Sequence, residues 1–132
     1  MPALAFSYAV VRVVPRVERE EFVNAGVILF CAERRFLGCR LLVDATRLSA
    51  RLGALAPRLE TGEIVRHLAA LRGVCEGDAS AGPIATMSPS ERFHWLVAPR
   101  STSIQTSAVH AGISDDPGAT LAHLFETLVA AE

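Results

Sequence analysis

The sequence predicts an α+β domain: a small antiparallel sheet of three to four strands, starting with an N-terminal β-meander and covered by helices. Three apolar segments with strand-like spacing occupy the first 43 residues, and the apolar spacing becomes helical after Asp44. A chain of 132 residues that is 51% hydrophobic and 20% charged can bury a core without disulfides or structural metal ions. We therefore expect one domain over residues 1–132, with the order β-β-β-α-α-α-(β)-α and the helices on one face of the sheet.

The three N-terminal strands are expected over residues 4–14, 22–31 and 36–43. Side chains alternate between two faces in the first, and Pro15 ends it. Gly26, inside the second strand, indicates a bulge or a close backbone approach. A tight turn over residues 32–35 joins the second strand to the third, and such short links favour an antiparallel meander.

Four helices are expected, over residues 44–53, 59–75, 88–98 and 116–129. Asp44 can cap the first and Gly53 can end it. Ser88 and Glu91 form a capping box around Pro89 at the start of the third. The last helix carries apolar residues at i, i+3, i+4, i+7 and i+8, namely Leu121, Leu124, Phe125, Leu128 and Val129. Residues 77–87 are expected to form a flexible exposed loop, and residues 104–109 a fourth strand.

Charge and composition argue against several classes of partner. A formal net charge of −1 supplies no overall field for nucleic acid, and eight aromatic residues are few for a base-stacking platform. No apolar run is long enough to span a membrane, and the N-terminus lacks the basic region of a signal peptide. We expect a cytoplasmic protein of bacterial or archaeal type that binds neither nucleic acid nor membrane.

The cysteines and histidines are not spaced as metal ligands. Cys31, Cys39 and Cys75 are odd in number and have apolar neighbours, which predicts three reduced thiols without a disulfide. No Cys-x-x-Cys or His-x-x-x-His pattern occurs, and no glycine-rich phosphate loop is present. We therefore expect neither a metal nor a cofactor.

Polar chemistry is concentrated between Ser88 and Gln105, a stretch that contains the single tryptophan. An arginine fork next to hydroxyl groups and free backbone amides can hold a phosphate or a carboxylate. We expect two arginines of this stretch to converge with neighbouring hydroxyls on one anion site, and Arg12 to join them if it points the same way. The candidate ligand-binding residues are Arg12, Arg92, His94, Trp95, Arg100, Ser101, Thr102 and Gln105.

Each candidate also has a structural interpretation. The hydroxyl groups can simply satisfy a turn while the arginines are solvated. Trp95 can be a core or half-buried anchor, and Arg12 can extend its charged end to water from a strand end. Because no nucleophile motif is present, we assign no catalytic residue. We expect a non-enzymatic binding or regulatory module for a protein partner or an anionic small ligand.

The alternative is an enzyme that acts on a phosphorylated or nucleotide-like substrate. In that case His94 would act as the acid or base, and Arg12 and Arg100 would stabilise charge.

Three segments together resemble a bacterial family called domain of unknown function 3037 (DUF3037). They are Tyr8–Pro15, Glu21–Phe30 and Arg92–Gln105, and the His110-Ala-Gly112 and Asp116-Pro117 motifs fit as well. The resemblance covers nearly the whole chain. It implies a bacterial cytoplasmic setting and no established activity, and it hints at a kinase-like protein encoded by a neighbouring gene as partner. The matching signature positions are Arg12, Asn24, Gly26, Arg92, His94, Trp95, Arg100, Ser101 and Thr102.

Overall fold

The computed structural model describes residues 3–53, 61–100 and 102–130, and it confirms the α+β class. The strands are β1 (Leu4–Val13), β2 (Val23–Cys31), β3 (Phe36–Leu41), β4 (Ile104–Thr106) and β5 (His110–Ser114). The α-helices are α1 (Ala45–Leu52), α2 (Thr61–Glu76), α3 (Pro89–Leu96) and α4 (Pro117–Phe125), and α4 continues into a π-helical turn over Glu126–Ala130. The expected start of the second helix, at Leu59, lies outside the described residues.

All strand pairs are antiparallel, in the order β3-β2-β1-β4, and β5 pairs with the other half of the same β1 edge. The β3-β2-β1 meander is therefore confirmed. The fourth strand is shorter than expected, and β5 was not expected. Ser107 joins the two short strands to β1, because its backbone N–H donates to the Val10 carbonyl while its hydroxyl accepts from the Val10 N–H.

Gly26 has both features that the sequence suggested. The β1–β2 register shifts between Val11, which pairs with Gly26, and Arg12, which pairs with Asn24, so that Ala25 is the extra residue of a bulge. A Cβ added at Gly26 would lie 2.4 Å from the Leu41 side chain and 2.8 Å from the Arg40 carbonyl oxygen. Only glycine allows β3 to approach this closely.

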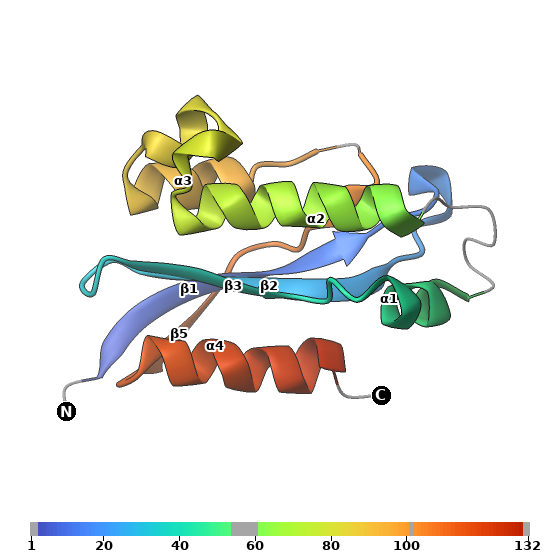
Figure 1. Cartoon of the computed structure of the whole chain (residues 1–132). Coiled ribbons are helices and arrows are strands. Elements are labelled where there is room, and N and C mark those ends of the chain that lie inside the picture. Colours follow the sequence, from blue (N-terminus) through green and yellow to red (C-terminus); the bar gives the residue numbers. More distant parts are fainter. Residues whose placement is uncertain (1–2, 54–60, 101, 131–132) are drawn as a thin grey trace.

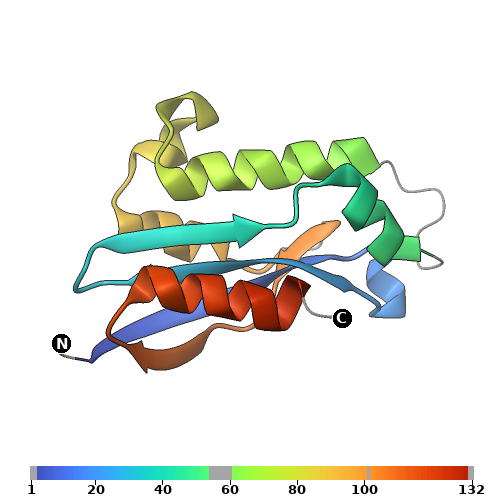
Figure 2. The same cartoon turned by 60° about the horizontal axis from the view of Figure 1, so that its bottom comes forward.

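Helices cover both faces of the sheet, so the expectation of helices on one face is wrong. Figure 1 shows α2 and α3 on one side and α4 on the other, and Figure 2 brings α4 to the front. The side chains confirm this, since Phe30 of β2 stacks on Phe93 of α3, whereas a Cβ at Gly38 of β3 would meet Leu121 of α4. Buried residues therefore follow one another without alternation along Ala25–Leu29.

The predicted caps are present. The Asp44 carboxylate accepts hydrogen bonds from the amides of Thr46 and Arg47, and Ser88 and Glu91 form the reciprocal capping box. Gly53 ends α1 with a φ of 43°. The 77–87 segment, expected as a loop, contains two 3₁₀ turns, over Ala79–Ala81 and Pro83–Thr86.

None of the helices in the described ranges has the length and apolar character needed to cross a membrane.

Candidate functional site

A cleft of about 690 Å³ opens between α2 and the C-terminal end of α3. Apolar side chains from three elements form much of its wall: Leu71 and Val74 of α2, Leu96 of α3 and Ile104 of β4. Val14 and Pro15, just after β1, also line it. This volume lies within the usual range for ligand-binding pockets.

Trp95 and Arg100 lie together in the wall of this cleft. Trp95 is 43% exposed, and the Arg100 guanidinium carbon lies 4.5 Å from the centroid of its ring. A large aromatic ring left this exposed is unusual for a core anchor, whereas tryptophan and arginine are the residues most enriched at binding hot spots. The interpretation of Trp95 as a buried core residue is therefore wrong.

The end of α3 fixes the position of Arg100. Its Nη1 donates to the Leu96 carbonyl at 2.8 Å and its Nη2 to the Trp95 carbonyl at 2.7 Å, so that the cation satisfies the last turn of the helix. A guanidinium has five N–H donors. Those not used here have no other hydrogen-bond partner among the described residues. Arg100 is thus held in place while retaining donors for a ligand.

Thr102 also lines the cleft, but its polar atoms shape the local turn. Its hydroxyl donates to the Ile104 carbonyl at 2.8 Å, and its own carbonyl accepts from the Gln105 side-chain amide at 2.9 Å. These bonds agree with the turn interpretation of the hydroxyl groups. Ser101 lies outside the described residues.

The sequence did not single out His67, which lines the same cleft from α2 together with Ala70, Leu71 and Val74. Their helical spacing provides a signal, because they form a second stripe beside the one buried by Ile64 and Leu68. Arg100 is the one arginine among the described residues of the lining, which include no lysine and no carboxylate. The cleft therefore suits a ligand that is apolar and carries an anionic group.

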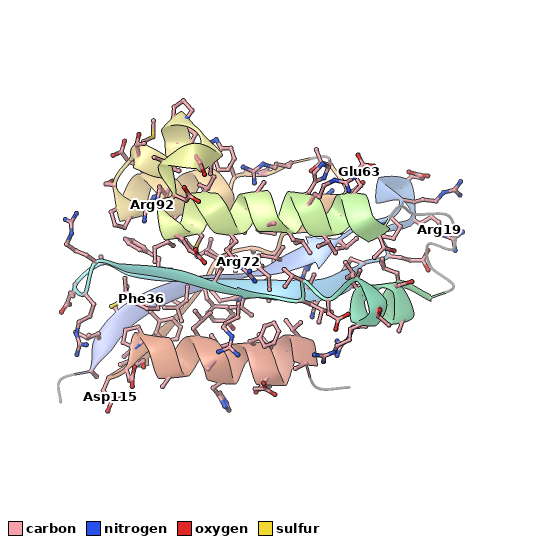
Figure 3. The ribbon with its side chains drawn as sticks, viewed as in Figure 1. Arg19, Phe36, Glu63, Arg72, Arg92 and Asp115 are labelled. Carbon is pink, nitrogen blue, oxygen red and sulfur yellow. The ribbon has the colours of Figure 1, made fainter. Side chains whose placement is uncertain are left out.

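Arg92 lies at the opposite end of α3 from Arg100. It donates to the Met87 carbonyl at 2.7 Å and to the Cys75 carbonyl at 3.4 Å, which joins the start of α3 to the last turn of α2 (Figure 3). The expected convergence of Arg92 and Arg100 on one anion site is therefore wrong. Met87, which accepts from Arg92, precedes α3, whereas Trp95 and Leu96, which accept from Arg100, are its last two residues.

His94 is not among the residues that line the cleft. It is exposed, and its Nδ1 lies 2.7 Å from the Ser90 carbonyl one turn earlier in α3. Its ring meets the Phe93 ring edge-on.

Arg12 and Gln105 lie on the other face of the sheet from the cleft. They pair with each other across β1 and β4, one residue away from Val13 and Ile104, and Ile104 lines the cleft. The Arg12 guanidinium carbon lies 4.0 Å from the centroid of the Phe22 ring. Arg12 does not join Arg100, so the constellation that the enzyme alternative required, Arg12, His94 and Arg100, is not assembled.

Within the part of the chain that the structure describes, no three His, Cys, Asp or Glu side chains gather as a metal site would require.

Comparisons with known proteins give one match. The model of the family described as "Protein of unknown function (DUF3037)" matches residues 8–129, which confirms the resemblance carried by the three segments. Neither the search of curated proteins nor the search of solved structures gives a significant match. The chain belongs to the DUF3037 family.

Proposed function

We propose that this protein is a binding module whose cleft between α2 and α3 takes a segment of a partner protein with a large apolar side chain next to a carboxylate. One observation carries the proposal: Trp95 is 43% exposed and holds Arg100 against its ring in the wall of an apolar cleft. Tryptophan supplies a large contact area, and arginine supplies the charge-assisted bond.

The wall of the cleft favours an apolar side chain on the bound segment. Leu71, Val74 and Ile104 offer aliphatic surface beside the indole, in a space large enough for a bulky side chain. Burying such a side chain contributes about 1.5–3 kcal/mol. An apolar anchor of this kind is how a short segment gains most of its affinity.

The charge of the cleft lining favours an acidic group on the bound segment. The described lining contains one arginine and no carboxylate, so an anionic group on the ligand meets a complementary field. The carbonyls of Trp95 and Leu96 already orient the arginine, so little side-chain entropy is lost when a carboxylate binds.

The proposal also includes a candidate for the partner protein. The family resemblance suggests a kinase-like protein encoded by a neighbouring gene, in a bacterial cytoplasm, as the first full-length partner to test. An anionic small ligand is the competing occupant, and the experiment below separates the two.

The test is a selection from a random heptapeptide library against the full chain, repeated with Arg100→Gln. We expect wild-type selections to enrich peptides with an aromatic or large aliphatic residue next to Asp or Glu, and Arg100→Gln to lose the acidic preference while keeping the apolar one. Arg47→Gln, an exposed arginine of α1 away from the cleft, is the matched control and should select the wild-type motif.

A selection without any consensus would contradict the peptide proposal. If phosphate or citrate then raised the unfolding midpoint of wild type but not of Arg100→Gln, the occupant would be a small anion.

A further inference from the structure

Two cysteines from different elements meet between the sheet and α2, away from the proposed binding residues. Cys39 lies on β3, next to Gly38, whose added Cβ would meet α4. Because neighbouring strand residues face opposite sides, Cys39 faces α2. Cys75 lies in the last turn of α2, and the two thiols are hydrogen-bonded to each other.

A cation completes the cluster. Arg72 lies three residues before Cys75, so the two share one side of α2, and it interacts with the Cys39 sulfur through both its charge and a hydrogen bond. Figure 3 shows Arg72 directed from α2 toward β3. Its Nε also lies 4.0 Å from a Glu76 carboxylate oxygen.

The two thiols differ in acidity. The pKa of Cys39 lies below its usual value, first because of the hydrogen bond with Cys75 and then because of the Arg72 charge, while burial acts in the opposite direction. The pKa of Cys75 is raised, because its proton is held in the bond to Cys39 and because the site is buried. A thiolate is the nucleophilic form of cysteine, and the neighbouring Arg72 charge favours that form on Cys39.

Access favours the same member. Cys39 is partly exposed, whereas Cys75 and Cys31 are fully buried. A small oxidant therefore reaches Cys39 first.

We propose that Cys39 and Cys75 form a reversible thiol-oxidation site, which a hydroperoxide converts to a disulfide between β3 and α2. The Cys39 sulfur attacks one peroxide oxygen and the O–O bond breaks, which gives a sulfenic acid on Cys39 and, after protonation, an alcohol or water. The Cys75 sulfur then attacks the Cys39 sulfur. An S–S bond forms and the bond between the Cys39 sulfur and its oxygen breaks. The hydroxide leaves as water with the Cys75 proton.

The electrons balance in this sequence, because the two thiols lose two electrons and the peroxide gains two. A dithiol reductant returns both cysteines to thiols by exchange. The disulfide would hold the last turn of α2, whose Val74 lines the cleft, against β3. The inference does not rest on the proposed peptide binding.

The test treats the folded, reduced full chain with hydrogen peroxide, removes the peroxide, unfolds the protein in the presence of a thiol-blocking reagent, and maps the peptides without reduction. We expect a Cys39–Cys75 cross-linked peptide, an intact mass lower by two hydrogens, and a blocked Cys31. Dithiothreitol should restore three free thiols. Cys31→Ala is the matched control and should form the same cross-link.

The order of the steps is tested with Cys75→Ala. This variant should accumulate a sulfenic acid on Cys39 that dimedone traps, and Arg72→Gln in the otherwise native chain should slow cross-linking severalfold. Three blockable thiols after peroxide treatment of wild type, or a cross-link through Cys31, would overturn the proposal. The cross-link and the thiol count are measured on the wild-type protein, so they decide the proposal even if Cys75→Ala does not fold.

Discussion

Three arginines of this chain show how the position of a side chain decides its role. Arg92 and Arg100 both donate to backbone carbonyls, but at opposite ends of α3. Arg12 stacks on Phe22 on the far face of the sheet. Of the three, Arg100 is the one that lines the cleft, so its structural role coincides there with the proposed binding role.

Arg100→Ala should lower the free energy of unfolding by about 1–2 kcal/mol, even without a ligand. The change removes two charge-assisted hydrogen bonds from the end of α3 and the stacking on Trp95. Urea unfolding measures the effect. Arg47→Ala, an exposed arginine on α1, is expected to change it by less than about 0.5 kcal/mol. Equal effects of the two substitutions would show that the contacts of Arg100 contribute nothing to stability.

Gly26→Ala should lower the free energy of unfolding by about 1–3 kcal/mol, because the added methyl group would overlap the Arg40 carbonyl and the Leu41 side chain. Gly62→Ala on α2 is the matched control. There the nearest atom lies 3.7 Å from the added Cβ, and alanine in a helix is favoured by up to about 1 kcal/mol. A Gly26→Ala protein as stable as wild type would contradict the close approach of β3.

At the scale of elements, α4 explains why β2 is buried on both faces. It packs on β2 and β3 opposite α2 and α3, with Leu121, Phe125 and Val129 buried. Leu124 and Leu128 are partly buried beside them. The continuous apolar run in β2 already carried this signal, since a strand covered on one face alternates instead.

Phe125→Ala should cost about 3–5 kcal/mol of unfolding free energy, because it leaves a cavity under α4. Thermal or denaturant unfolding measures it. His123→Ala, an exposed position on the same helix, is the control and should have little effect. A midpoint that barely moves in Phe125→Ala would mean that α4 is peripheral to the core.

Local signals predicted most of the fold. The alternation in β1, the Gly26 bulge and the caps at Asp44 and Ser88 depend on neighbouring residues and were confirmed. β5 was missed because it is a short edge strand, with Gly112 at its centre and Ile113 exposed by 73%, so it shows no regular apolar face.

The candidate site was predicted only in part, because local sequence signals do not specify how distant elements pack. Trp95, Arg100 and Thr102 are close in sequence and lie in one cleft. His67 and Leu71 reach that cleft only through the packing of α2 on the sheet, which local spacing does not specify. The assignment of Arg12 failed because the direction in which it points depends on which face of the sheet each helix covers.

At the scale of the whole molecule, the three layers place the two proposed sites on different sides of α2. One side of the helix lines the cleft, and another carries Arg72 and Cys75 toward β3. The same helix therefore carries residues of both proposed sites, although the two proposals can fail separately.

The protein as purified should contain three free thiols. Cys31, Cys39 and Cys75 are all free in the structure. A thiol titration of unfolded, unreduced protein that has not been exposed to peroxide checks this. Fewer than three thiols in freshly prepared protein would contradict the reduced resting state.

Trp95 is the residue that we propose anchors a ligand in the cleft. The most direct measurement is the affinity of one selected peptide for wild type, Trp95→Ala and His94→Ala, by calorimetry. The account predicts that Trp95→Ala weakens binding by at least about 30-fold, which corresponds to about 2 kcal/mol, while His94→Ala on the outer side of the same helix leaves it unchanged. Equal affinity of Trp95→Ala and wild type, with both proteins folded, would contradict the account.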